Sequence, residues 1–265
     1  MRKLSLILAA VLLFGMPVCA EDPHGGVVYS WKNSGKQIAL TFDDGPHPQQ
    51  TPEILAILEE YGIRATFFVI GQNAQWYGDC LAMVYEAGHE IGNHSFSHAN
   101  LTKTGYDGVC QEIEETEHLI GDRVPCRTSL LRPPEGMIGE DVFRAAAERD
   151  YTVVCWSVDT RDWAHTPPES IAQNVLSTVE GGDIILFHDY IGGDTPTPTA
   201  LRMIIPKLLE QGYEFVTVSE LIGGSEGNEK SEERRENENF LRKLKNQNVR
   251  FGDIVQLPTA RLYLG

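Results

Sequence analysis

The chain has 265 residues, of which 42% are hydrophobic and 23% are charged, so its composition is that of a globular protein and not of a disordered or collagen-like chain. Its 38 acidic and 22 basic residues give a formal net charge of −16. That balance argues against nucleic acid as the main partner, because phosphate binding requires clustered Lys and Arg. The length allows one large α/β domain or two small ones.

The first 20 residues have the pattern of a secretory signal. Arg2 and Lys3 precede a short apolar run. Val18 and Ala20 then place small or modest side chains before a cleavage site. The apolar run is shorter than the roughly 20 residues that a spanning helix needs, and a short membrane anchor is the alternative interpretation. We therefore expect export, a secreted or cell-envelope location, and no stable membrane span after cleavage.

Four cysteines follow the predicted signal: Cys80, Cys110, Cys126 and Cys155. None of their spacings resembles a zinc cluster, and four cysteines in an oxidising compartment allow three pairings. We favour a Cys80–Cys110 disulfide, because both residues would lie in early turns of neighbouring helices. Cys155 lies inside an apolar strand and is alternatively a buried thiol.

Apolar, strand-forming runs alternate with helical patterns along the middle of the chain. Several of these runs are continuously apolar, as expected of strands that are covered on both faces. Strands that alternate with helices predict a parallel sheet. The strands are expected at 38–42, 65–70, 89–93, 128–132, 152–157, 183–188 and 214–218.

Capping residues and glycines mark the helices between these strands. Thr51 is predicted to cap a helix that has Pro52 in its first turn and ends at Gly62. Pro206 is expected to kink or shorten the last helix, because proline lacks the backbone N–H that a helix interior requires. The helices are expected at 51–62, 77–87, 107–120, 166–181 and 199–211.

Polar residues capable of chemistry follow the predicted strands. In a β/α barrel the carboxyl ends of the strands converge on one face, where active sites form. We therefore predict a distorted (β/α)7–8 barrel in preference to an open doubly wound sheet. The polar clusters are 43–47 (DDGPH), 94–98 (HSFSH), 132–134 (RPP), 159–163 (DTRDW) and 186–189 (LFHD).

Two of these clusters carry candidate metal ligands. His94 and His98 are four residues apart, a spacing that brings two imidazoles to one side of a helical turn. A carboxylate from another strand end would complete a site with positions left for water and substrate, and the ligand types favour zinc over iron, cobalt or manganese. Of Asp43 and Asp44, one can ligate while the other removes a proton from water. An exposed helix face for the histidines and a turn cap for either aspartate are the structural alternatives.

The later clusters offer an acid and its supporting groups. His188 ends an apolar strand, where a histidine is often a core residue, but opposite a metal it can protonate a leaving group. Either Asp162 or Asp159 can orient its ring, as a carboxylate does for histidine in many hydrolases. Arg132 can pair with Asp43 and hold it, or form an ion pair at the barrel rim.

In order and spacing these segments resemble the five motifs of the polysaccharide deacetylase family (NodB-like, carbohydrate esterase family 4). The resemblance covers about residues 36–222. It implies a distorted (β/α) barrel that removes acetyl groups from glycans with the help of a divalent metal. The segments that carry it are 41–46 (TFDDGP), 94–98 (HSFSH), 132–136 (RPPEG), 159–163 (DTRDW) and 186–188 (LFH).

The resemblance implies a role for each motif residue. Asp43 is similar to the general base, and Arg132 to the residue that orients this base. His188 is similar to the general acid, with Asp162 tuning it. The metal implied is most commonly zinc, with Co2+ or Mn2+ as alternatives, and the residues similar to its ligands are Asp44, His94 and His98.

Other motif residues would line the substrate groove. Trp163 and Leu186 resemble walls of the acetyl-binding groove, although aromatic residues such as Trp163 and Phe96 also suit plain core packing. Pro134 and Glu135 belong to the same groove, and Glu135 replaces an aromatic residue that the family usually has. The family's oxyanion donor at that position is a backbone N–H, which survives a side-chain change. We therefore expect catalysis to persist and substrate preference to shift, with a cationic, partly deacetylated sugar favoured.

These interpretations divide the chain into a signal peptide (1–20), an N-terminal extension (21–35), a catalytic domain (36–222) and a linker and tail (223–265). We expect a monomeric enzyme that hydrolyses N-acetyl groups of N-acetylglucosamine-containing glycans, either peptidoglycan or chitin-like oligosaccharides. One alternative is an O-deacetylase of acetylated xylan. The other is a catalytically inactive glycan-binding protein on the same scaffold.

Overall fold

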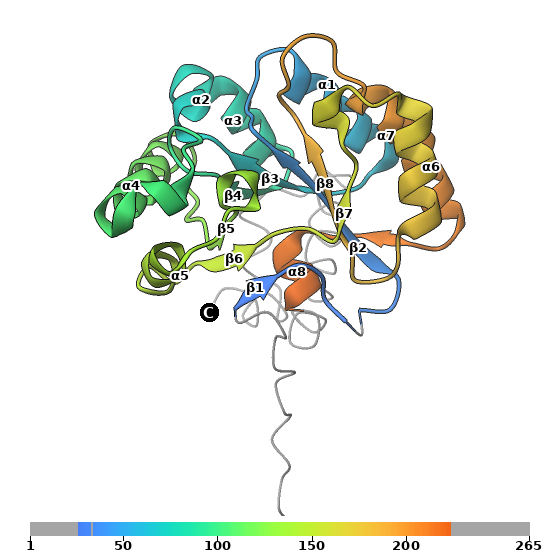
Figure 1. The fold of residues 1–265 in the computed structure, drawn as a ribbon. Helices are drawn as coiled ribbons and strands as arrows, with labels where there is room; N and C mark the ends of the chain where they lie inside the picture. The colour runs from blue at the N-terminus through green and yellow to red at the C-terminus, as the bar shows by residue number, and fades with distance from the viewer. Residues whose placement is uncertain (1–25, 33, 224–265) are drawn as a thin grey trace, which may run out of the picture.

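A single parallel sheet organises the described part of the chain, residues 26–32 and 34–223 of a computed structural model (Figure 1). The predicted signal peptide and most of the predicted tail lie outside these residues. The first strand falls in the segment predicted as an extension and pairs with β6. The strands are β1 (Val27–Val28), β2 (Gln37–Asp43), β3 (Thr66–Val69), β4 (Glu90–Asn93), β5 (Leu130–Leu131), β6 (Thr152–Val154), β7 (Val158–Asp159), β8 (Ile184–His188) and β9 (Glu214–Phe215).

The sheet is curled into a distorted barrel. Its strand order is β1-β6-β5-β4-β3-β2-β8-β7, with β9 added beside β2. Strands β6 and β7 are six places apart in this order, which would separate them by about 29 Å in a flat sheet. Only residues 155–157 connect them, and such a link reaches at most about 15 Å. The two edges therefore approach each other, and Figure 1 shows this connection crossing in front of the sheet.

The barrel interior is apolar at one end and polar at the other. Alternate residues of a strand face the same side, so Ala39 and Asp43 of β2 both point inward, at opposite ends. The last helix closes the apolar end: the N–H of Val218 donates to Thr66 at the start of β3, and the N–H of Ser219 donates to Glu90 at the start of β4. The interior cluster comprises Ala39, Phe68, Leu130, Val154, Ile184, Val216, Val218 and Leu221.

Helices cover the outside of the sheet in two groups (Figure 1). Buried side chains of α1, α3, α6 and α7 form the larger outer cluster, and those of α4 and α5 form a smaller one. The helices are α1 (Gln50–Tyr61), α2 (Gly71–Trp76), α3 (Gly78–Glu86), α4 (Gly105–Arg123), α5 (Glu140–Ala147), α6 (Pro168–Thr178), α7 (Thr197–Glu210) and α8 (Val218–Ile222). Short 3-10 turns lie at η1 (Leu101–Lys103), η2 (Pro134–Gly136) and η3 (Asp162–Ala164). Among the described residues, no helix combines the length and the hydropathy needed to cross a bilayer.

Several helix boundaries differ from those expected. Gly62 ends α1 in the left-handed conformation, with a φ of 63°, as predicted. Thr51 does not cap this helix, which begins one residue earlier, and its hydroxyl instead donates to the carboxylate of Asp189. Pro206 does not end α7, which continues to Glu210.

The predicted Cys80–Cys110 disulfide is wrong, because all four cysteines of the described chain are free thiols. Cys110 is buried in the outer cluster beneath α4 and α5, and Cys155 is buried in the same cluster. These thiols fill core volume as small apolar groups. The sequence patterns did not reveal helices α2 and α5. Helix α5 adds Val142 to the cluster that holds these two thiols, and helix α2 adds Ala74 to the larger outer cluster.

Candidate active site

The polar residues of the five motifs gather at the carboxyl ends of the strands. Asp43 ends β2 and His188 ends β8, and the two are directly paired across these neighbouring strands. His94 follows β4, and Arg132 follows β5. Asp162 begins the turn that follows β7. The convergence that the barrel topology predicts is therefore present.

Three side chains converge on a point that suits a metal ion. One carboxylate oxygen of Asp44, Oδ1, lies 3.4 Å from Nε2 of His94 and 3.2 Å from Nε2 of His98. These donor atoms all lie within 4.8 Å of one another. In a tetrahedral site with bonds of about 2.1 Å, neighbouring ligand atoms are about 3.4 Å apart. The spacing of the three residues therefore fits a small divalent cation.

The electrostatics at this point favour positive charge. Oδ1 of Asp44 is buried and has no hydrogen-bond partner, which is unusual because a buried carboxylate oxygen without a donor is destabilising. Burial lowers the pKa of His94, but the charges of Asp43 and Asp44 outweigh it, and the pKa lies above its ordinary value. Two nitrogen ligands and one oxygen ligand match the preferences of zinc, cobalt and related ions. The residues thus fit the cation that the sequence predicted.

His94 presents Nε2 to this point because its other ring nitrogen is occupied. Nδ1 lies 2.7 Å from the backbone carbonyl oxygen of Arg132. A carbonyl can only accept, so Nδ1 carries the proton and donates it. The lone pair of Nε2 is then free when the ring is neutral, as metal ligation requires. The chain following β5 therefore fixes the tautomer of a residue that follows β4.

The segment between the two histidines is a loop and not the helical turn that their spacing suggested. Ser95 and His98 both adopt left-handed backbone conformations, with φ values of 65° and 57°. Glu112 of α4 holds the loop by accepting hydrogen bonds from the backbone N–H groups of Phe96 and Ser97 at 2.8 Å each. A loop with two left-handed residues turns the second imidazole back toward the first. The spacing predicted the pairing, but not the conformation that produces it.

Asp43 is held by a buried arginine. Nη1 of Arg132 donates to Oδ1 of Asp43 at 2.7 Å and to the hydroxyl of Thr41 at 2.8 Å. Nη2 of the same guanidinium donates to the carbonyl of Cys155 at 2.8 Å. Arg132 is fully buried, and its guanidinium lies 4.1 Å from the ring centroid of Phe68. This arrangement occupies one oxygen of Asp43 and leaves Oδ2 toward the metal-ligand cluster, 3.8 Å from Nε2 of His94.

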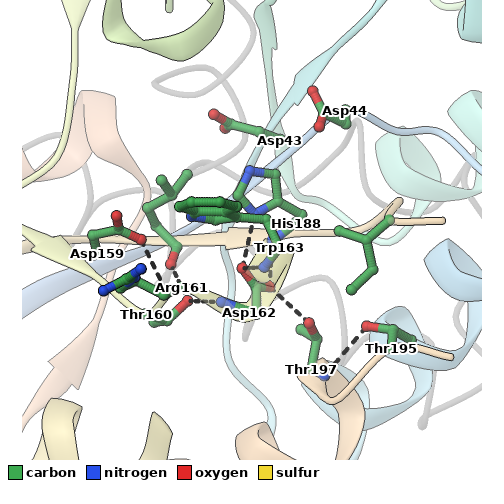
Figure 2. Close-up of polar contacts among 12 residues, drawn as sticks. Asp43, Asp44, Asp159, Thr160, Arg161, Asp162, Trp163, His188, Thr195 and Thr197 are labelled. Carbon is green, nitrogen blue, oxygen red and sulfur yellow. Dashed lines mark hydrogen bonds and ion pairs between the residues drawn. The ribbon is translucent and has the colours of Figure 1, made fainter. Parts of the chain in front are cut away.

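His188 is paired with Asp162 (Figure 2). Nδ1 of His188 lies 2.8 Å from Oδ1 of Asp162, and the backbone N–H of His188 donates to Oδ2 at 2.8 Å. Burial lowers the pKa of His188, but the hydrogen bond and the charge of Asp162 outweigh it and raise the pKa to about 9. Asp159, the alternative partner, instead accepts a hydrogen bond from the N–H of Arg161. The imidazole therefore carries a proton near neutral pH.

The carboxylate of Asp162 is fully satisfied. Besides the two bonds from His188, Oδ1 accepts the backbone N–H of Trp163 at 2.9 Å and Oδ2 accepts the hydroxyl of Thr197 at 2.7 Å. Asp162 and Thr197 are both fully buried. Four donors therefore fix the position of this carboxylate. One of them, Thr197, is the first residue of α7, and the sequence patterns did not indicate its role.

Comparison with known proteins identifies the family of this chain. A family profile described as polysaccharide deacetylase matches residues 31–154. A peptidoglycan-N-acetylglucosamine deacetylase from Bacillus cereus is 40% identical over 203 residues, which span 76% of this chain and 95% of the relative. This chain belongs to the polysaccharide deacetylase family.

Solved structures agree with this assignment. A peptidoglycan N-acetylglucosamine deacetylase in complex with a 4-naphthalen-1-yl-N-oxidanyl-benzamide superposes with a TM-score of 0.72 at 36% identity, covering 74% of this chain and 92% of the other. A family 4 acetyl xylan esterase from Clostridium thermocellum, in complex with a cobalt ion, gives a TM-score of 0.67 at 36% identity, covering 70% and 90%. The predicted family, barrel and deacetylase class are thereby confirmed.

The predicted groove residues of the deacetylase differ in how much surface they offer. Trp163 is 49% exposed, and its backbone N–H donates to Asp162, the partner of His188 (Figure 2). Leu186 is only 3% exposed and lies on the same strand face as His188, one layer deeper. Pro134 is buried, and Glu135 is exposed in a left-handed conformation with a φ of 58°. Trp163 and Glu135 are therefore the predicted groove residues that a ligand can reach.

Asp189 is a buried residue of the deacetylase site that sequence reasoning did not assign. Its Oδ1 accepts the N–H of Gly45 at 2.9 Å, and its Oδ2 accepts the hydroxyl of Thr51 at 2.6 Å. A Cβ at Gly45 would lie 2.0 Å from this carboxylate, so only glycine permits the contact. Burial raises the pKa of Asp189 to about 7, partly offset by these hydrogen bonds. The residue ties the loop after Asp44 to the end of β8.

Proposed function

We propose that the chain is an exported, metal-dependent deacetylase that hydrolyses the N-acetyl group of N-acetylglucosamine residues in a glycan and releases acetate. The observation that carries the proposal is the unpartnered, buried Oδ1 of Asp44 facing two imidazoles. A proton acceptor and a proton donor, Asp43 and His188, stand on adjacent strands at the same point. Such a site can cleave an amide in one addition and elimination, without a covalent acyl-enzyme.

Asp44, His94 and His98 are the residues that would hold the metal, for which zinc is the favoured identity. When bound there, a divalent cation supplies Lewis-acid chemistry, polarising a carbonyl oxygen and lowering the pKa of water. Asp44 is suited to ligation because its Oδ1 has no competing donor. His94 is suited because its Nδ1 is already bound to a carbonyl oxygen.

Asp43 is the proposed general base. Arg132 binds Oδ1 of Asp43 and leaves Oδ2 to accept a proton from water. Thr41 and the carbonyl of Cys155 hold the guanidinium in turn, so Oδ1 of Asp43 stays paired with Arg132 while Oδ2 faces the cluster of metal ligands. Arg132 therefore acts as a positioning residue that separates the role of Asp43 from that of its neighbour Asp44.

His188 is the proposed general acid. Its Nδ1 is bound to Asp162, so the proton available for transfer is the one on Nε2. The pKa of about 9 keeps Nε2 protonated at neutral pH. Transfer of this proton to the departing nitrogen releases a neutral amine, after which the imidazole recovers a proton from solvent.

The substrate proposed is the N-acetylglucosamine of peptidoglycan or of chitin-like oligosaccharides. The Bacillus cereus relative, which this chain covers almost completely, is a deacetylase of peptidoglycan N-acetylglucosamine. The charged start and apolar run of residues 1–20 support export, and a secreted or cell-envelope location would bring the enzyme to such a glycan. A monomer suffices, because every proposed group belongs to one chain.

O-deacetylation of acetylated xylan is the second candidate. The similar structure from Clostridium thermocellum is an acetyl xylan esterase. The same base, acid and ligands serve an ester as well as an amide, because both reactions pass through a tetrahedral oxyanion. Substrate comparison, and not site geometry, separates these two candidates.

Acetate release tests the proposal. The full chain, with zinc or cobalt added, should release acetate from N-acetylglucosamine oligomers or peptidoglycan faster than from acetylated xylan. Asp43→Asn should lower kcat by about 10²- to 10⁴-fold, the usual contribution of a general base. Asp159→Asn is a matched control, because this aspartate lies on the same face but binds only a backbone N–H. Full activity of Asp43→Asn would refute the assigned base, and faster release from xylan would favour the ester.

A further inference from the structure

A row of aromatic rings borders the site on the side away from Trp163. Tyr190 stacks on His47, with ring centroids 4.6 Å apart and an interplanar angle of 14°. His47 contacts Tyr77 edge to face at 6.0 Å, and Tyr77 contacts Trp76 in the same way at 6.4 Å. Tyr190 and Trp76 are 39% and 65% exposed, although large aromatic residues are usually buried. Nothing in the catalytic roles proposed above accounts for this exposed row.

Tyr190 is held rigidly by the residues on both sides of it. Asp189 is fixed by the N–H of Gly45 and the hydroxyl of Thr51. Ile191 is clamped by the side-chain amide of Gln50, which accepts its N–H at 3.0 Å and donates to its carbonyl at 2.9 Å. The backbone of Tyr190 therefore has little freedom to move.

The ring of Tyr190 is fixed as well, because its inner face lies on His47. Nδ1 of His47 accepts the backbone N–H groups of Gln49 and Gln50 at the start of α1, at 3.4 and 3.3 Å. The stack covers one face of the tyrosine ring, and 39% of the residue remains exposed, so we take the opposite face as the one open to solvent. A rigid aromatic face offers contact area at a small entropy cost on binding.

The position of this face relative to the site follows from the topology. Tyr190 is two residues beyond His188, so its backbone lies within about 7 Å of the proposed acid. Strand β8 runs between β7 and β2. Trp163 follows β7, and His47, which carries the stack, follows β2. Two exposed aromatic residues thus stand on opposite sides of His188.

We propose that the outer face of Tyr190 binds a sugar ring of the same glycan chain, next to the unit that loses its acetyl group. This proposal rests on the proposed function, since a polymer held with one unit at the metal site must continue across the surface beside it. The apolar face of a pyranose fits a flat, exposed ring whose hydroxyl stays in water. Continuity with the catalytic site favours this occupant over a partner protein, which would need a much larger apolar patch.

Substrate length is the variable that tests the proposal. Kinetics with the full chain should compare N-acetylglucosamine oligomers of two to six units with an aryl acetate that has no second sugar. For the longer oligomers, Tyr190→Ala should raise KM about tenfold and change kcat by less than about twofold, while aryl acetate hydrolysis stays unchanged. Tyr190→Phe keeps the stack and should behave like the wild type. Trp31→Ala is the matched control, because this tryptophan is similarly exposed, at 40%, but lies at the other end of β8. Its backbone N–H donates to the carbonyl of Gly182, just before β8 begins.

Calorimetric binding separates failure of the subsite from failure of the proposed function. A hexamer of N-acetylglucosamine should bind the wild type about tenfold more tightly than it binds Tyr190→Ala, whether or not acetate is released. Equal affinity, no binding to the wild type, or an equal loss of kcat on every substrate would overturn the proposal. If Tyr190→Ala does not fold, Tyr190→Leu keeps the bulk without the aromatic face and should show the same rise in KM.

Discussion

The two halves of the site are built on opposite principles. The half formed by β2 and β4 leaves a buried carboxylate oxygen of Asp44 without any donor, facing two imidazoles. The half formed by β7 and β8 gives the carboxylate of Asp162 four donors, from the backbone and side chain of His188, from Trp163 and from Thr197. Asp162 is fully buried and the side chain of Asp44 is 24% exposed, and the buried oxygen of Asp44 is the one without a hydrogen-bond partner.

This difference shows which half depends on a ligand. A buried carboxylate oxygen without a hydrogen-bond donor costs the fold free energy that a bound cation would recover. Burial raises the pKa of Asp44, but His94, His188 and His98 outweigh it and hold this pKa below its ordinary value, so the site already favours opposite charges. A carboxylate with four donors stabilises the fold by itself and orients the group beside it. The metal half is therefore incomplete without a cation, whereas the acid half is preorganised without substrate or metal.

Removing the carboxylate of Asp44 should have the largest effect on function and a small effect on the metal-free fold. Asp44→Ala should lower kcat/KM by roughly 10³-fold and abolish the rise in Tm that zinc gives the wild type. Without metal, the unfolding free energy of the variant should lie within about 1 kcal/mol of that of the wild type, because the substitution removes no hydrogen bond to Oδ1. Thermal unfolding with and without zinc measures both effects.

Asp122→Ala is the control for this variant, because Asp122 forms an exposed aspartate–histidine pair with His118 on α4. Its response to zinc and its activity should match those of the wild type. Zinc stabilisation that survives in Asp44→Ala would show that the cation binds elsewhere.

The acid half should show the next largest effect, through the titration of His188. The folded-state pKa of about 9 lies above the ordinary 6.5. The His188–Asp162 pair therefore stabilises the fold fully below about pH 6.5 and loses this contribution as the pH rises through about 9. Asp162→Asn should lower the His188 pKa to 6.5 or below and reduce kcat about 10²-fold at pH 8.

NMR titration of the His188 imidazole in metal-free protein measures this pKa directly, as the midpoint of the titration curve. Asp159→Asn should leave it near 9, because Asp159 binds only the N–H of Arg161. A midpoint that stays near 9 in Asp162→Asn would assign the raised pKa to other charges, such as those of Asp43 and Asp44.

The sequence predicted the converging motif residues well because parallel strands impose the result. Asp43 and His188 end predicted strands, His94 and Arg132 lie at the ends of two others, and the carboxyl ends of parallel strands meet at one face. The convergence of these residues depends neither on side-chain detail nor on the local conformation of each loop, since the segment from His94 to His98 was expected to be helical and is not.

The supporting residues could not be predicted, because their partners lie far away in the chain. Thr197 donates to a carboxylate 35 residues earlier, and Asp189 accepts from an N–H 144 residues earlier. A threonine that begins a helix and an aspartate after a histidine have no distinctive pattern. The edge strand β1 was missed for a different reason: two residues, Val27–Val28, are too few to show any periodicity.

Asp189 joins the two halves, and its effect should be intermediate. Its pKa of about 7 lies above the ordinary 3.8, so the folded state favours the protonated form. Its contribution to stability is greatest below about pH 4 and falls as the pH rises to about 7. In metal-free protein, the unfolding free energy of Asp189→Asn should not show this decrease with pH. At pH 8 it should exceed that of the wild type by about 1–3 kcal/mol.

Denaturant unfolding between pH 4 and pH 8 tests this prediction, with Asp79→Asn as an exposed control. The difference in unfolding free energy between the variant and the wild type should grow with pH across that range. A constant difference would mean that the Asp189 carboxyl does not titrate there.

The smallest effect should come from removing one of the four donors to Asp162. Thr197→Val keeps the volume of the buried side chain but leaves Oδ2 with the N–H of His188 alone. The expected cost is about 1–2 kcal/mol of unfolding free energy and a few-fold loss of kcat, because the other three donors still hold the carboxylate. Thr178→Val, at an exposed hydroxyl that donates to Asn174, is the matched control. A loss of activity as large as that of Asp162→Asn would show that the four donors act as one unit, and that the acid half is no more self-sufficient than the metal half.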